Sequence, residues 1–137
     1  MRFAFLAAVA ASLLAACSGG AVPGSENAEA RVVGVLTIAP RALATRIDAG
    51  EAIQLIDVRT PEEFAEGHLA GAINIPVDDF DPAALPDAGV AERVLYCRSA
   101  RRSGVAAEKL AQASGSVAVH LEGGILAWEK AGLPVQR

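Results

Sequence analysis

Histidine and cysteine, the side chains that most often bind transition metals, are scarce in this chain. Its 137 residues include two histidines and two cysteines. His68 follows a glycine in a predicted turn, and His120 stands in no motif that marks a general base or a metal ligand. A structural zinc site takes four protein ligands and a catalytic one takes three, so we expect no metal centre and no cofactor.

Positive charge is also in short supply over the chain as a whole. Twelve Lys and Arg stand against sixteen Asp and Glu, which gives a net charge of −4. Non-specific binding to nucleic acid needs a basic face, so we expect no nucleic-acid partner. The exception is local, because Arg98, Arg101 and Arg102 lie close together. A cationic loop on an acidic protein favours a small anionic substrate.

Residues 1–16 resemble a secretory signal peptide, with one arginine, a short apolar run and small residues. The run is shorter than the ~20 apolar residues of a transmembrane helix. Leu14–Cys17 resembles the lipobox of bacterial lipoproteins, in which the signal is cleaved before a cysteine that carries a diacylglycerol. An ordinary signal peptide with an incidental cysteine is the alternative.

The lipobox resemblance makes Cys17 the lipidated first residue of the mature chain, with the membrane as a partner through this lipid. Residues 17–31 are rich in Gly, Ser and Pro and are predicted to be a flexible tether. Residues 32–137 then form the folded domain. We expect a periplasm-facing lipoprotein of the bacterial cell envelope. Ser18, in place of aspartate, favours the outer membrane over the inner one.

Cys97 has no disulfide partner if Cys17 is lipidated. Disulfides form readily in exported proteins, so a lone free thiol indicates a function. A buried, inert cysteine is the alternative, and the arginines that follow Cys97 in the sequence argue against it.

Short apolar runs alternate with helix-forming segments along the rest of the chain. We predict strands at residues 32–38, 52–58, 72–76, 93–96 and 117–121. We predict helices at residues 40–47, 61–67, 101–113 and 125–130. The helix at 101–113 is expected to bury a face of Val105, Ala106, Leu110 and Ala113. Residues 79–89 are predicted to be a loop with a helical turn.

This alternation predicts an α/β layer fold with a mainly parallel sheet. Thr60, Pro61 and Glu63 mark one helix start, with a capping box and a proline at the first helical position. Binding sites in such folds form beyond the carboxyl ends of the strands. Cys97 follows one of these ends and Asp57 lies near another, so both are candidate site residues.

Cys97 lies where a predicted strand passes through a loop into a predicted helix. Free N–H groups of the loop and of the first helical turn can point at the thiol and carry partial positive charge. The nearby arginines add full positive charge. Both favour the thiolate over the thiol, which is the condition for a reactive cysteine.

Four segments, in this order, resemble the rhodanese (sulfurtransferase) superfamily. They are Leu55–Arg59 with Pro61–Phe64, Gly67–Pro76, Tyr96–Ser103, and Leu121–Gly124 with Trp128. The resemblance covers roughly residues 35–136. It implies a three-layer fold in which helices flank a mainly parallel central sheet.

The resemblance also implies an activity for Cys97. This residue would accept a sulfane sulfur from an anionic donor such as thiosulfate, form a persulfide and pass the sulfur to cyanide or a thiol. A periplasmic thiol protein is one open choice of acceptor. The six-residue loop from Cys97 to Arg102 favours sulfur transfer, because phosphatase relatives have one residue more. A thiolate-based phosphatase or arsenate reductase, and a non-catalytic binding module on the same scaffold, are the alternatives.

The other loop residues are expected to bind the substrate or to shape the loop; they are Arg98, Ser99, Ala100, Arg101, Arg102 and Ser103. Arg102 is predicted to stabilise an anion or the loop, with an ion pair to the scaffold as the alternative. For Arg98 and Arg101 the alternative to substrate contact is a solvated surface charge. Ser99 and Ser103 are expected to supply amides or to cap the helix. Asp57 and Arg59 are expected to brace the loop.

Ala100 departs from the family pattern, in which glycine is frequent at this position. A positive φ would strain an alanine there by about 1 kcal/mol. Further along the chain, Gly123 and Gly124 are expected to make a tight turn near the loop. Trp128 is expected to pack the last helix onto the core.

Overall fold

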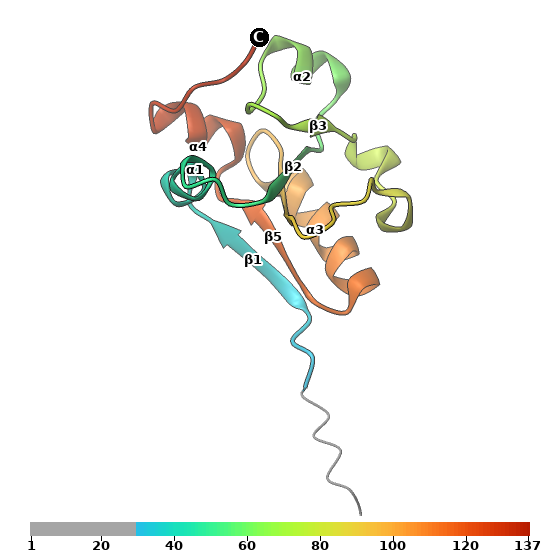
Figure 1. Ribbon diagram of the computed structural model, residues 1–137. Helices are drawn as coiled ribbons and strands as arrows, with labels where there is room; N and C mark the ends of the chain where they lie inside the picture. The colour runs from blue at the N-terminus through green and yellow to red at the C-terminus, as the bar shows by residue number, and fades with distance from the viewer. Residues whose placement is uncertain (1–29) are drawn as a thin grey trace, which may run out of the picture.

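The computed structural model describes residues 30–137, which form one parallel five-stranded sheet with helices on both faces (Figure 1). The strand order is β1-β5-β4-β2-β3, and all pairs are parallel. The strands are β1 (Gly34–Ile38), β2 (Ile53–Asp57), β3 (Ile73–Asn74), β4 (Glu92–Tyr96) and β5 (Val117–Leu121). The helices are α1 (Pro40–Asp48), α2 (Pro61–Glu66), α3 (Arg101–Ser114) and α4 (Gly124–Lys130). Two short 3₁₀ helices, η1 (Val77–Asp79) and η2 (Pro82–Ala84), follow β3.

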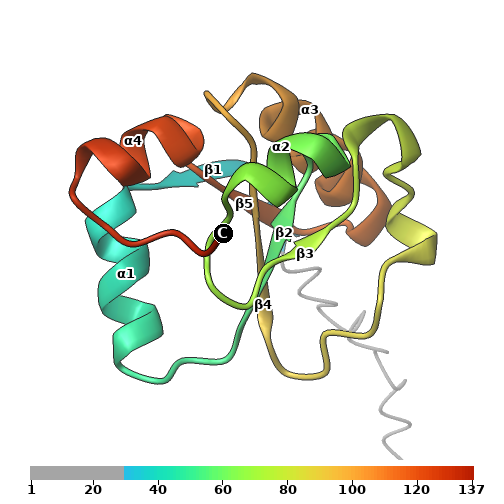
Figure 2. The same cartoon turned by 90° about the horizontal axis from the view of Figure 1, so that it is seen from above.

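The helices cover the two faces of the sheet unequally. Seen from above, α1 and α4 lie on one side of the sheet and α3 on the other (Figure 2). A hydrophobic core lies on each face of the sheet, and alternate residues of β4 point into one or the other. Leu95 packs with α3, while Val94 and Tyr96 pack with α1 and α4. All three are fully buried, as expected for a parallel strand covered on both faces. The predicted α/β fold with its parallel central sheet is therefore confirmed.

The predicted elements are present, with small shifts at their ends. The first strand begins at Gly34 rather than at residue 32, and β3 has two residues instead of five. The capping box of α2 is formed, because Thr60 Oγ1 accepts from the amide of Glu63 and the Glu63 carboxylate accepts from the amide of Thr60. Trp128 packs against the core on the α1 side and donates from Nε1 to the carbonyl of Pro134 at 2.9 Å, as expected for a packing residue.

The buried face of α3 differs from the prediction. Val105 is 44% exposed and Ala113 is also exposed. The buried residues are Ser103, Ala106, Ala107, Leu110 and Ala111. The sequence pattern misplaced the face because it ignored Ser103, a polar residue that points inward toward the loop.

The predicted signal peptide, Cys17 and most of the tether lie outside the described residues. Within residues 30–137, no helix combines the length and the apolar character needed to cross a bilayer.

Candidate active site

Cys97 follows β4 directly, at the carboxyl edge of the sheet and between neighbours β2 and β5. Its thiol is free and the residue is 1% exposed. The side chain packs with Ile56, Val58 and Leu95 in the core on the α3 side. This packing fixes the sulfur at the base of the loop that follows.

The loop after Cys97 turns its carbonyl groups outward, toward the start of α4. The amide of Ile125 donates to the carbonyl of Cys97 at 2.8 Å, and the amide of Leu126 donates to the carbonyl of Arg98 at 3.2 Å. Gly124 makes this approach possible, because it has φ +60° and a Cβ there would lie 2.5 Å from the Arg98 oxygen and against the Cys97 oxygen. The predicted tight turn at Gly123–Gly124 is therefore present, and it supports the loop.

The loop amides face the sulfur and change its acidity. Burial raises the pKa of the Cys97 thiol, while the hydroxyl and amide of Ser103 and the amides of Ser99 and Ala100 lower it. The net effect is a pKa below that of an ordinary cysteine. Hydrogen-bond donors that favour a charged form lower the pKa of an acid, so this cradle stabilises a negative charge on the sulfur.

Ala100 adopts the positive φ that would strain an alanine at this position. It has φ +83° and ψ −19°, and within residues 30–137 it is the single non-glycine residue with a positive φ. Its carbonyl accepts from the amide of Gly104 at 2.9 Å and from the Ser103 hydroxyl at 3.1 Å. The chain therefore keeps a left-handed residue at the start of α3, at a cost of about 1–2 kcal/mol.

Ser103 joins the sulfur to a buried histidine that sequence reasoning left without a role. Ser103 Oγ lies 3.0 Å from Nδ1 of His120, and both residues are buried. Burial lowers the pKa of His120, so its imidazole is neutral at pH 7. The sequence held one weak sign, a histidine at the carboxyl end of an apolar strand that is the sheet neighbour of β4.

Arg102 forms a two-pronged ion pair with Glu63 of α2. Its Nη1 and Nη2 atoms donate to the two carboxylate oxygens at 2.7 and 2.8 Å. The hydrogen bonds from Arg102, with that from the amide of Thr60, lower the pKa of Glu63 to about 2 despite partial burial. This is the scaffold ion pair considered as the alternative role of Arg102. Sequence reasoning recognised Glu63 only as a capping residue.

Asp57 and Arg59 form a second, buried ion pair beside the loop. Arg59 Nη2 donates to the Asp57 carboxylate at 2.6 Å and to the carbonyl of Gly67 at 2.6 Å. The Asp57 side chain is fully buried, and that of Arg59 is 7% exposed. The pair ties the end of β2 to the end of α2, so it braces this wall of the site.

His68 has a structural environment in the same region. Its ring stacks on Phe64 at 3.8 Å, and its Nδ1 lies 3.0 Å from the Phe64 carbonyl. Its backbone pairs with Gln136 near the C-terminus.

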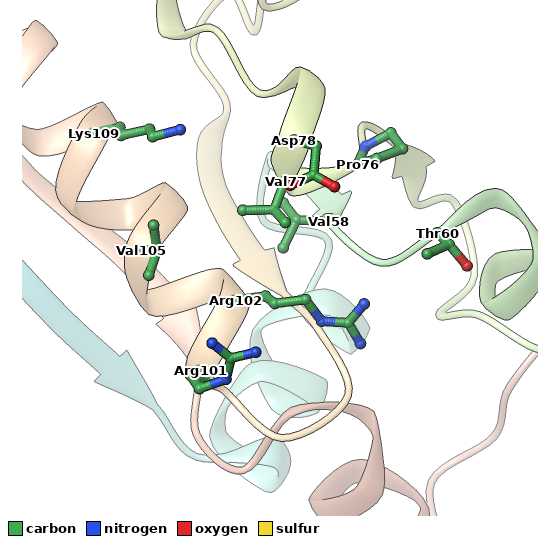
Figure 3. Close-up of a pocket in the computed structure, with 9 residues that line it drawn as sticks. All are labelled: Val58, Thr60, Pro76, Val77, Asp78, Arg101, Arg102, Val105 and Lys109. Carbon is green, nitrogen blue, oxygen red and sulfur yellow. The ribbon is translucent and has the colours of Figure 1, made fainter.

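Arg98, Ser99 and Arg101 are exposed on the outer side of the loop. Arg101 and Arg102 border a pocket of about 510 Å³ between α3 and η1, shown in Figure 3.

In the described part of the chain, no three His, Cys, Asp or Glu side chains are grouped so as to hold a metal ion.

Comparison with known proteins assigns this chain to a family. Residues 39–131 match the model of the rhodanese-like domain. The chain belongs to this family. The rhodanese-like resemblance stated from the sequence is thereby confirmed.

Relatives of this rhodanese-like chain include proteins named sulfurtransferases. It is 34% identical over 93 residues to a sulfurtransferase of Allochromatium vinosum, covering 68% of this chain and 87% of that protein. It is 43% identical over 99 residues to an uncharacterized protein of Synechocystis, covering 72% of this chain and 55% of that one. A rhodanese-related protein of Thermoplasma volcanium superposes with a TM-score of 0.63 at 31% identity, over 73% of this chain and 96% of that one.

Some curated relatives are considerably longer than this chain. It spans 24% of a probable adenylyltransferase/sulfurtransferase of Mycobacterium tuberculosis and 55% of the Synechocystis protein. The similarity therefore supports sulfurtransferase chemistry at the level of the family.

Proposed function

We propose that this rhodanese-like protein is a sulfurtransferase that carries sulfur as a persulfide on Cys97. The donor is a small sulfane-sulfur anion such as thiosulfate, and the acceptor is cyanide or a thiol. One observation carries the proposal. Cys97 is a free thiol whose pKa is lowered by Ser103 and by the amides of its own loop.

In the first step the Cys97 thiolate attacks the outer sulfur of thiosulfate. A bond forms between Cys97 Sγ and this sulfur, the bond within thiosulfate breaks, and sulfite leaves with the electron pair. The thiolate and thiosulfate repel each other, so donors around the sulfur lower the barrier by offsetting this negative charge. The amides of Ser99, Ala100 and Ser103 donate to the Cys97 sulfur without any side-chain rearrangement.

In the second step the acceptor thiolate attacks the outer sulfur of the persulfide. The bond between that sulfur and Cys97 Sγ breaks, and its electron pair returns to Cys97 as the thiolate. The acceptor leaves as a persulfide, or as thiocyanate when cyanide is the acceptor. Two displacements through one covalent intermediate predict ping-pong kinetics.

The role of His120 in this scheme is to orient the Ser103 hydroxyl. When Nδ1 of His120 carries its proton, it donates to Ser103 Oγ, and the hydroxyl hydrogen is then free to turn from the Ala100 carbonyl toward the sulfur. The chain of hydrogen bonds stabilises the thiolate before attack and again when it leaves the persulfide. His120 is thus a positioning residue.

The location of the protein is part of the proposal and rests on the lipobox-like Leu14–Cys17 segment. Lipid on Cys17 would hold the domain at the envelope, facing the periplasm. Intact mass measurement of the protein purified from its own membranes tests this, because a diacylglycerol on Cys17 changes both the mass and the detergent requirement. A mature chain that keeps a free Cys17 would contradict it.

The catalytic proposal is tested by incubating the full chain with thiosulfate and measuring the mass of the peptide that contains Cys97. We expect a gain of one sulfur atom that dithiothreitol removes, together with thiocyanate formation when cyanide is added. Cys97→Ser is the matched control and should show neither. A wild-type protein that gains no sulfur and forms no thiocyanate would contradict the proposal.

A further inference from the structure

The pocket between α3 and η1 lies next to the Cys97 loop and has no role in the two displacements. It measures about 510 Å³ and is formed by one side of α3 and by the segments that follow β2 and β3. Thiosulfate has five heavy atoms. A water molecule, which has one, occupies about 30 Å³ of the liquid, so thiosulfate fills only a small part of this volume. The pocket is therefore much larger than the donor needs, and its volume is in the range of small-molecule sites.

One side of α3 supplies a row of side chains to this pocket. Arg101, Val105 and Lys109 are four residues apart and follow one another along the helix in Figure 3, opposite Val77 and Asp78. Side chains at this spacing share one face of a helix. The row therefore presents a cation at each end and an exposed apolar side chain between them.

The two cations of this row have no carboxylate partner among residues 30–137. Arg101 and Lys109 are both exposed and neither forms an ion pair there, whereas Arg102 is held by Glu63. Asp78 is the one carboxylate that lines the pocket, and it comes from the opposite wall. The α3 side of the pocket is thus the side that attracts an anion.

We propose that this pocket binds the sulfur acceptor, and that the acceptor is a small thiol with a carboxylate distant from its sulfur. The inference rests on the proposed sulfurtransferase function. Arg101 is the first residue of α3, and Lys109 lies about 12 Å further along the helix axis. A thiol placed at the loop would bring its carboxylate to Lys109 and its apolar midsection onto Val105. A peptide of three residues in an extended conformation spans roughly this length.

Docking in this pocket serves the second displacement alone. The acceptor thiol releases its proton to solvent, its sulfur forms a bond to the outer sulfur of the persulfide, and Cys97 Sγ takes the electron pair of the broken bond. Thiosulfate makes no use of Lys109, so a change at Lys109 should leave the first displacement intact.

Two synthetic thiols test the inference. The anionic one is N-acetyl-cysteinyl-alanyl-glycine and the neutral one is its C-terminal amide, so the two differ by one carboxylate and the thiol has the same neighbours in both. The full chain is first loaded with sulfur from thiosulfate, and kcat/KM for the acceptor step is then measured with each peptide. An exposed charge pair contributes up to about 1 kcal/mol, so we expect the wild type to favour the anionic peptide by about fivefold.

Lys109→Glu and Lys130→Glu are the matched variants, because both change the net charge equally and Lys130 is an exposed residue of α4 outside the pocket. We expect Lys109→Glu to lose the preference, Lys130→Glu to keep it, and both to load sulfur at the wild-type rate. Equal use of the two peptides by the wild type, or an equal loss in both variants, would overturn the acceptor site while leaving the sulfurtransferase in place. A wild type that never loads sulfur would overturn the proposed function, and this inference with it.

Discussion

Replacing Ala100 by glycine should stabilise the protein, although glycine in a helix normally weakens it. Ala100 has φ +83° at the start of α3, a region that costs a residue with a Cβ about 1–2 kcal/mol. Glycine removes this strain but gives the unfolded chain more freedom, which costs about 0.5–1 kcal/mol. The expected net gain is about 0.5–1 kcal/mol. For a domain of this size it corresponds to a rise in Tm of about 3 °C.

The matched control is Ala113→Gly, an exposed position in the last turn of α3 where the backbone is helical. There glycine should lower the free energy of unfolding by about 0.5–1 kcal/mol. Urea unfolding of the wild type and the two variants gives both values. If Ala100→Gly lowers stability as much as Ala113→Gly does, Ala100 is not strained in solution and the described loop geometry is wrong.

The remaining predictions concern the sulfur, the ion pair of α2 and the support of the loop. Ser103→Ala should slow alkylation of Cys97 at pH 7 by about tenfold. This factor corresponds to the free energy of about 1.5 kcal/mol that one hydrogen bond to a charged group contributes. His120→Leu should shift the alkylation pH profile of Cys97 toward higher pH. His120→Asn keeps a donor near the Nδ1 position and should restore the wild-type profile. An unshifted profile in His120→Leu would contradict the positioning role. The Glu63 carboxylate has a pKa of about 2 instead of 4.5, so its contribution is present above pH 4.5 and is lost as the pH falls toward 2. Urea unfolding should show Glu63→Gln less stable than the wild type by about 1 kcal/mol at pH 6 and nearly as stable as the wild type at pH 2. A difference in the free energy of unfolding that does not change with pH would contradict the ion pair. Gly124→Ala should abolish persulfide formation while the far-ultraviolet circular dichroism stays native, because the new Cβ would collide with the Arg98 carbonyl; full activity would show that α4 does not support the loop.

The elements of the fold were predictable because their patterns are local. The strand before Cys97 is an apolar run, and α2 begins with its own capping box. Strands that alternate with helices leave few arrangements other than a parallel sheet. The position of Cys97 at the carboxyl edge followed from that arrangement, and so did the nearness of Asp57.

The parts of the site that were missed depend on contacts between distant segments. Glu63 and Arg102 are 39 residues apart, and Ser103 and His120 are 17 apart. Each of these side chains has a local explanation in the sequence, as a cap, a surface charge or a strand residue. Only the packing of α2, α3 and β5 around one loop brings them together, and no spacing rule expresses that.

The three arginines of the loop illustrate the same limit. Their closeness in the sequence predicted a cationic loop that favours an anionic substrate, with a surface charge as the alternative role of Arg98 and Arg101. The folded helix separates them, since Arg102 turns to Glu63 while Arg98 and Arg101 stay at the surface. Backbone amides and Ser103 supply the donors that act on the sulfur, and a sequence does not show where its amides point.

The ionisation of Cys97 is the property on which the whole mechanism depends. It is measured directly by alkylating the full chain with iodoacetamide at a series of pH values and quantifying the peptide that contains Cys97. We predict a midpoint below the value of about 8.5 for a free cysteine, with Ser103→Ala shifted upward. A midpoint at or above 8.5 would show that burial outweighs the donors, and it would contradict the proposed nucleophile.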